Sequence, residues 1–152
     1  MSRIVFDDTL LTGIDGVDEQ HETLIEIYNR LDDAYHAGRA HREMREILAR
    51  LFQYTKIHFE TEEALMARYG YEGYEDHCAQ HCELVEQLRR FVVRFTRNEE
   101  RISTDILEFV SNWITHHIRE ADLEFARPLR AAMAEERSLL GHEAPEPASG
   151  QR

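Results

Sequence analysis

The near-absence of helix breakers between residues 18 and 127 limits what this chain can fold into. The stretch contains no proline and only three glycines. Gly38, Gly70 and the polar segment 97–100 divide it into four pieces in which apolar residues recur every three or four positions, as in amphipathic helices. The sequence therefore predicts helices over about 18–37, 40–69, 73–96 and 103–127, with Pro128 breaking or kinking the last one.

Four long helices with short connections predict an all-α fold, an up-down-up-down four-helix bundle. Residues 1–17 are expected to form an N-terminal arm with turns at Gly13 and Gly16, and Asp15 or Asp18 can cap the first helix. We expect one domain over residues 1–140, ending in a short C-terminal helix over 129–140. Residues 141–152 are expected to form a disordered tail.

Charge and composition exclude several partners. The formal net charge of −12 has no basic run to offset it, which argues against binding to nucleic acid or to an anionic membrane. No apolar run reaches transmembrane length, and the first residues lack the apolar segment of a signal peptide, so the cytoplasm is the default expectation. Cys78 and Cys82 lie four apart in a predicted helix, where a good disulfide is not expected.

Every predicted helix places histidine among its apolar positions. His58 and Glu62 are four residues apart, so on a helix they share one face with apolar neighbours. Three of the nine histidines lie near helix ends or in the tail and are expected at the surface: His36, His41 and His142. The histidines expected to face inward are His21, His58, His77, His81 and one of the His116–His117 pair.

The fourth helix separates the two neighbouring histidines by angle. At about 100° per residue, with Ile114 at zero, His117 lies about 60° away and His116 about 160° away. His117 is therefore expected to face inward and His116 to face solvent. Asp122 lies about 80° to the other side of Ile114, so it is about 140° from His117. The two can meet at one centre only if both lean inward or the helix is locally distorted.

One buried histidine is commonplace, but five inward histidines with two inward carboxylates need a shared explanation. Each could be a core residue bonded to its own neighbour, since a desolvated polar group destabilises a protein unless it has a partner. A shared metal centre satisfies all of them at once. Imidazole and carboxylate without thiolate suit iron, manganese, zinc or copper, and two carboxylates that can each bridge two ions suggest a dinuclear site.

Other metal sites fit the pattern less well. The segment from His58 to Glu62 is not the H-E-x-x-H motif of zinc proteases. Histidines and cysteines on the single stretch 77–82 cannot converge tetrahedrally on zinc. Ferritin-like di-iron proteins use Glu-x-x-His motifs and more carboxylates, whereas this pattern is rich in histidine and poor in carboxylate.

The residues resemble the hemerythrin family, in particular its stand-alone bacterial form. The resemblance covers about residues 6–130. It rests on four motifs: Gly13-Ile14-Asp15-Gly16-Val17-Asp18-Glu19-Gln20-His21, His58-Phe59-Glu60-Thr61-Glu62-Glu63, His77-x-x-x-His81 and Trp113-Ile114-Thr115-His116-His117-x-x-x-x-Asp122. All seven ligand positions of the family are filled in order. The family also uses the five-residue step from His117 to Asp122.

The resemblance implies a non-haem di-iron centre with two Fe ions and O2 as its ligand. One iron is expected on His77, His81 and His117, and the other on His21 and His58. Glu62 and Asp122 are expected to bridge both ions, with a solvent-derived oxo or hydroxo as third bridge. The second iron then keeps one open position for dioxygen. The residues expected to line this position are Phe59, Trp113, Ile114 and Ile118, which could equally be plain core.

Three functions fit such a centre. The first is reversible dioxygen binding by an oxygen carrier, storage or delivery protein, with an oxygen-using enzyme as recipient. The second is a di-iron enzyme with peroxidase, NO-reducing or oxidase activity, which the histidine-rich ligand set disfavours. The third is an oxygen or redox sensor module, disfavoured because no sensory or output domain is recognised in the sequence. A metal-free structural bundle is the remaining alternative. We expect a monomeric protein that is not an enzyme.

Overall fold

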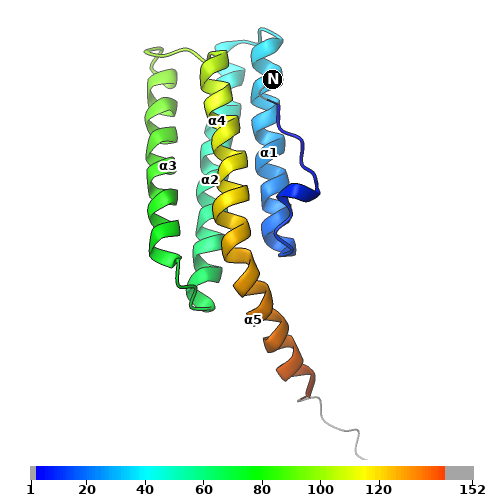
Figure 1. Cartoon of the computed structure of the whole chain (residues 1–152). Helices are drawn as coiled ribbons and strands as arrows, with labels where there is room; N and C mark the ends of the chain where they lie inside the picture. The colour runs from blue at the N-terminus through cyan, green and yellow to red at the C-terminus, as the bar shows by residue number, and fades with distance from the viewer. Residues whose placement is uncertain (1–2, 143–152) are drawn as a thin grey trace, which may run out of the picture.

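The computed structural model describes residues 3–142 and shows four long helices packed side by side as a bundle (Figure 1). No strand occurs within that range. The four helices are α1 (Asp15–His36), α2 (His41–Arg68), α3 (Tyr74–Thr96) and α4 (Thr104–His117). These bounds confirm the predicted all-α bundle, and most of the helix ends agree with the sequence to within a residue or two.

Turn chemistry explains where the helices end. Gly38 and Gly70 have positive φ angles of 64° and 62°, a conformation that glycine adopts without strain just past a helix. The amide of Tyr71 then donates to the carbonyl of Met66 at 3.0 Å and closes the end of α2. At the start of α4, the hydroxyl of Ser103 accepts from the amide of Ile106 at 3.3 Å.

The start of α1 corrects the expectation that Asp15 or Asp18 caps this helix. The N-cap residue is Ile14, and no side chain caps the helix there. Asp18 instead reaches back, where its carboxylate accepts from the amides of Thr12 and Gly13 at 2.8 and 3.0 Å and from the Thr12 hydroxyl at 2.7 Å. Asp18 thereby fixes the turn that leads the N-terminal arm into α1.

Pro128 does not end the fourth helix. A π-helical turn, η2 (Ile118–Asp122), follows α4, and α5 (Leu123–His142) continues through Pro128. Figure 1 shows α4 and α5 as one rod that projects beyond the bundle. Proline removes one helical hydrogen bond, but Phe125 and Leu129 on either side are buried and hold the helix by packing. Gly141 and His142 still belong to α5; the rest of the expected tail lies outside the described residues.

The core is built in three layers along the bundle. A large apolar layer includes Tyr28, Leu48, Leu88, Phe95 and Leu107. A smaller apolar layer lies at the opposite end, near the start of α5, and comprises Ile14, Val17, Met66, Phe125, Ala126 and Leu129. Five buried histidines and the buried carboxylates Glu62 and Asp122 form what we call the polar layer; on α1 and α2 its residues fall between members of these two sets.

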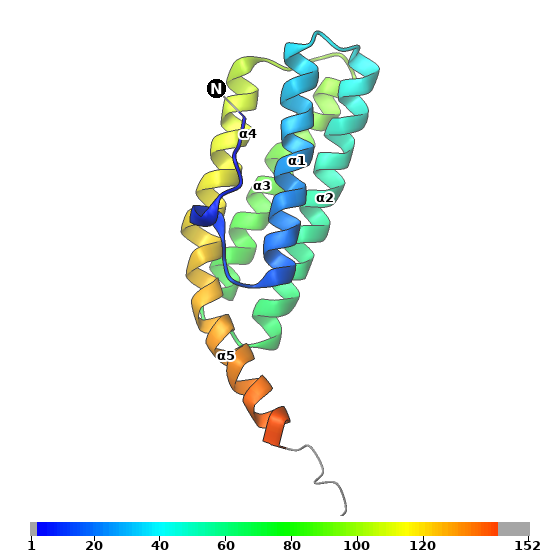
Figure 2. The ribbon, with the colours of Figure 1, turned by 90° about the vertical axis from the view of Figure 1, so that its right-hand side faces the viewer.

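The N-terminal arm closes one side of the bundle. Figure 2 shows it running along the bundle between α1 and α4, with the short turn η1 (Asp8–Leu10) on the α4 side. The Ile4 amide donates to Asn29 on α1 at 2.9 Å, and the Asn29 amide donates back to the Ile4 carbonyl at 2.8 Å. Ile4 and Leu10 are buried there, so the arm completes the apolar core.

A search of the helices among the described residues finds none that is long and apolar enough to cross a membrane.

Candidate metal centre

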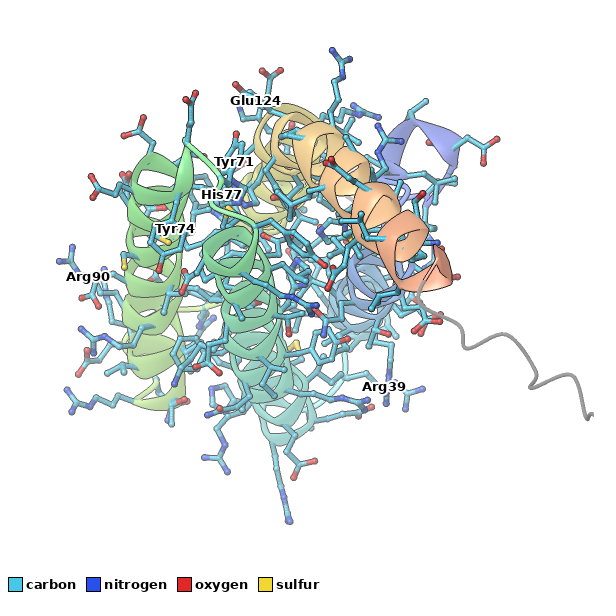
Figure 3. The ribbon with its side chains drawn as sticks, turned by 90° about the horizontal axis from the view of Figure 1, so that it is seen from below. Arg39, Tyr71, Tyr74, His77, Arg90 and Glu124 are labelled. Atoms are coloured by element: carbon cyan, nitrogen blue, oxygen red, sulfur yellow. The ribbon has the colours of Figure 1, made fainter. Side chains whose placement is uncertain are left out.

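The polar layer is formed by side chains from all four helices of the bundle and from the π-helical turn η2. Five histidines and two carboxylates, each buried, contribute to it: His21 from α1, His58 and Glu62 from α2, His77 and His81 from α3, His117 from α4 and Asp122 from η2. Figure 3 shows the contrast on α3, where His77 lies toward the other helices and Arg90 points to solvent. The structure thus brings together all seven residues proposed from the sequence as ligands.

The two oxygens of Glu62 face different histidines. Oε1 lies 3.2 Å from Nε2 of His21 and 2.8 Å from Nε2 of His58. Oε2 lies 3.3 Å from Nε2 of His77 and 3.1 Å from Nε2 of His81. One carboxylate therefore spans two groups of imidazoles.

Asp122 divides its oxygens in the same way. Oδ2 lies 2.9 Å from Nε2 of His21, while Oδ1 lies 3.1 Å from Nε2 of His77 and 3.2 Å from Nε2 of His117. Two sets of donor atoms result, and within each set all atoms lie within 4.8 Å of one another. We call them the three-histidine side (His77, His81, His117) and the two-histidine side (His21, His58); Glu62 and Asp122 belong to both.

The π-helical turn explains how His117 and Asp122 meet. In a regular helix, residues five apart point about 140° from each other. A π-helical turn bonds residue i to residue i+5, so residues five apart lie nearly above one another. Of the two possibilities that the sequence left open, local distortion of the helix is the one observed. His117 is buried and the neighbouring His116 is exposed, as the helical angles indicate.

Hydrogen bonds outside the polar layer fix one ring orientation. The Thr61 hydroxyl donates to the carbonyl of Ile57 at 3.1 Å, so its oxygen accepts from the Gln20 amide nitrogen, also at 3.1 Å. The Gln20 oxygen therefore faces Nδ1 of His58, which must donate to it at 2.8 Å. In the neutral ring this leaves a bare lone pair on Nε2 of His58, directed into the polar layer.

Unpartnered atoms show that the polar layer fits a bound cation. Four buried polar atoms form no hydrogen bond within the described residues: Nδ1 of His21, Nε2 of His58 and both carboxylate oxygens of Asp122. Nε2 of His58 lies 2.8 Å from a Glu62 oxygen without hydrogen-bond geometry. A lone pair facing a carboxylate repels it unless a cation lies between them, and imidazole with carboxylate is a donor set that iron accepts. The residues present therefore fit metal ions.

Without a metal, protons take the place of the cation. Burial lowers the pKa of His21 and His77, but the closely placed, negatively charged carboxylates of Asp122 and Glu62 raise it by more, to about 9 in each case. Burial raises the pKa of Glu62, yet the charge of His58 and the close approach of the His21, His58 and His77 rings hold it well below its usual value. The carboxylates thus stay ionised and draw positive charge into the layer.

Comparison with known proteins places this geometry in a family. A family model described as "Hemerythrin HHE cation binding domain" matches residues 12–129. The chain belongs to the hemerythrin family. It is 33% identical over 135 residues to a bacteriohemerythrin of Pseudomonas aeruginosa strain LESB58, covering 89% of this chain and 87% of that protein. A bacteriohemerythrin of Methylococcus capsulatus is 31% identical over 111 residues, covering 73% of this chain and 84% of that protein.

Solved hemerythrins have the same fold. A structure titled "Crystal structure of hemerythrin:wild-type" aligns with a TM-score of 0.79 at 28% identity, covering 83% of this chain and 97% of that chain. The crystal structure of a hemerythrin point mutant gives a TM-score of 0.80 at the same identity, covering 85% of this chain and 98% of that chain. This chain is therefore a hemerythrin-like cation-binding domain with a buried histidine and carboxylate cluster consistent with a di-iron site.

A small cavity of this hemerythrin domain is lined by His21 and His58 of the two-histidine side and by His117 of the three-histidine side. Its volume is about 10 Å³. The four residues expected to line the dioxygen position, Phe59, Trp113, Ile114 and Ile118, all border it. Leu24, three residues after His21, borders it as well, and helical spacing could have placed it there.

Sequence reasoning assigned no role to Gln20 and Glu63. Gln20 precedes His21 but contacts His58, and Glu63 follows Glu62 but contacts His81, whose Nδ1 lies 3.0 Å from its Oε1. Both contacts cross from one helix to another, so residue spacing along one helix does not reveal them.

The other histidines and the cysteines lie outside the polar layer. His36 is exposed, as expected. His41 was expected at the surface but is half-buried. Its ring stacks on the ring of Phe95, and its Nε2 is hydrogen-bonded to the backbone carbonyl of Phe95 at 3.0 Å. The start of α2 and the end of α3 meet at the same end of the bundle, and this explains the contact. The side chain of His142 lies outside the described residues. Cys78 and Cys82 are free thiols.

Proposed function

We propose that this protein binds dioxygen reversibly at a di-iron centre, as an oxygen carrier, storage or delivery protein. His77, His81 and His117 would hold one iron, and His21 and His58 the other. The bridging ligands would be Glu62 and Asp122, whose oxygens already face both sides. When bound, two ferrous ions supply the two electrons that dioxygen binding draws on and that return when it leaves.

The observation that carries the proposal is the unequal division of ligands next to a cavity. With a solvent-derived bridge and one oxygen from each carboxylate, three histidines would fill six coordination positions on one iron. Two histidines would fill only five on the other and would leave one position open. The small cavity is bordered by both histidines of this side and by one of the three on the other side, His117. The chain therefore provides a place for a small ligand beside the incomplete ligand set.

The cavity lining favours binding over turnover. Apart from the proposed ligands, its described lining residues are Leu24, Phe59, Trp113, Ile114 and Ile118. None of these side chains is a general acid or base. They keep water and external protons away from the cavity, which slows irreversible oxidation of a bound ferrous pair. We therefore propose that this protein is not an enzyme.

Anaerobic reduction followed by exposure to air tests the proposal. The reduced, iron-loaded protein should be colourless, gain a visible absorption band in air, and bleach again when argon removes the dioxygen. Rapid one-way oxidation with release of hydrogen peroxide would instead favour a di-iron enzyme. No spectral response to dioxygen would contradict both functions.

The proposal extends to the oligomeric state, the cellular compartment and the partners of the protein. We infer a monomer acting in the cytoplasm, with an oxygen-using enzyme as recipient and neither nucleic acid nor membrane as partner. Size-exclusion chromatography with light scattering of the iron-loaded protein tests the monomer, since one chain has a mass of 17.9 kDa.

A further inference from the structure

We propose that two outer hydrogen-bond partners, Glu63 on His81 and Gln20 on His58, make the two iron positions electronically unequal. Neither residue belongs to the seven proposed ligands. Each would act through a histidine, so both are positioning residues. The inference rests on the di-iron centre of the proposed function and adds that Glu63 favours the ferric state on the three-histidine side.

Glu63 places a carboxylate behind His81. Its Oε1 lies 3.0 Å from Nδ1 of His81, and an ionised carboxylate can only accept, so the ring donates from Nδ1. Nε2, at the other end of the ring, then carries the lone pair and lies 3.1 Å from both Glu62 Oε2 and His117 Nε2. The ring of His81 also stacks on Phe59, with centroids 3.7 Å apart and planes 2° from parallel, so its orientation is fixed from two directions.

Gln20 provides the same geometry behind His58 without the charge. Its amide is oriented by Thr61, and its oxygen accepts from Nδ1 of His58 at 2.8 Å. His21, the other histidine of this side, has no partner for Nδ1 within the described residues. Among those residues, Glu63 is the one carboxylate bonded to the outer nitrogen of a polar-layer histidine.

A charged outer partner and a neutral one have different electronic effects. A carboxylate that accepts from the outer nitrogen of a metal-bound histidine makes the ring a stronger donor, whereas an amide mainly orients it. A stronger donor stabilises Fe(III) over Fe(II). Glu63 should therefore lower the reduction potential of the three-histidine side, while Gln20 leaves that of the two-histidine side higher.

Charge-neutralising and charge-adding variants test this difference under nitrogen. Glu63→Gln removes the charge and keeps a hydrogen-bond acceptor, and Gln20→Glu adds a charge behind His58. The controls are Glu60→Gln and Gln53→Glu, which make the same charge changes at exposed positions of α2. The readouts are iron content, iron affinity by chelator competition, and the reduction potentials by spectroelectrochemical titration.

We expect Glu63→Gln to raise a reduction potential and Gln20→Glu to lower one, with Glu60→Gln and Gln53→Glu close to the unmodified protein. A tenfold change in the preference for ferric over ferrous iron corresponds to about 59 mV for one electron. Glu63→Ala, which also removes the hydrogen bond, should weaken iron affinity by roughly 10- to 100-fold.

Two results would overturn the inference: a Glu63→Gln potential equal to that of Glu60→Gln, or a Gln20→Glu potential equal to that of Gln53→Glu. Should Glu63→Gln lose iron while Glu60→Gln keeps it, positioning by Glu63 is supported and Gln20→Glu still tests the electronic effect. Because no dioxygen is used, shifted potentials in a protein that fails to bind dioxygen reject only the proposed function. Unshifted potentials in one that binds it reject only this inference.

Discussion

The large apolar layer and the polar layer lie on the same four helices, yet only one of them is complete in itself. In the apolar layer the buried hydroxyl of Tyr28 donates to the carbonyl of Leu107 at 2.8 Å, and Leu107 is fully buried. In the polar layer four buried atoms form no hydrogen bond to any residue from 3 to 142, and both oxygens of Asp122 are among them. The contrast indicates that the first layer stabilises the bundle and the second requires a cation.

Removing a single ligand should have the largest effect. His117→Ala takes one imidazole from the three-histidine side, and we expect it to abolish reversible dioxygen binding, measured as the loss of the visible band in air. The matched control is His116→Ala, which alters the exposed neighbour and should bind dioxygen as the unmodified protein does. Loss of binding in the control with retention in His117→Ala would reverse our assignment.

Removing the metal should destabilise the polar layer selectively. Under the proposed function iron binds the folded state, so at a free concentration about 1,000 times Kd it should stabilise the fold by about 4 kcal/mol. Calorimetry of the iron-loaded and chelator-treated protein measures this difference. Hydrogen exchange should show lost protection around His58 and Asp122 and little change around Leu107. Equal loss along the whole bundle would contradict the separation of layers.

A cavity in the apolar layer should lower stability without changing metal content. Leu107→Ala removes a fully buried side chain and should cost about 2–5 kcal/mol in urea unfolding. Its control, Leu139→Ala, alters a leucine that is 66% exposed and should stay within about 0.5 kcal/mol. Both variants should bind as much iron per chain as the unmodified protein; loss of iron in Leu107→Ala would show that the layers are coupled.

A further effect is expected from pH, on the metal-free protein. The pKa values of His21 and His77 are raised from 6.5 to about 9 when the chain folds. Their contribution to stability is therefore complete below about pH 6.5 and is lost as the pH rises through about 9. The melting temperature of the metal-free protein should fall over this interval, and that of the iron-loaded protein should fall less because iron replaces the protons. Parallel curves would contradict this.

Local spacing predicted most of the fold and the components of the candidate site. Periodicity and the turn glycines located the helices, and the motifs identified the seven residues that the structure brings together. The expected break at Pro128 was wrong, because the packing of Phe125 and Leu129 outweighs one lost hydrogen bond. The π-helical turn could not be predicted from an average angle per residue, and Gln20 and Glu63 act across helices, beyond the reach of spacing.

Anomalous diffraction at the iron absorption edge, from crystals of the iron-loaded protein, tests the central claim most directly. The account predicts two peaks bridged by Glu62 and Asp122, one bound by His77, His81 and His117 and the other by His21 and His58. The second iron should have one coordination position free of protein ligands, directed at the cavity lined by Phe59 and Trp113. A single peak, or peaks away from these seven side chains, would contradict it.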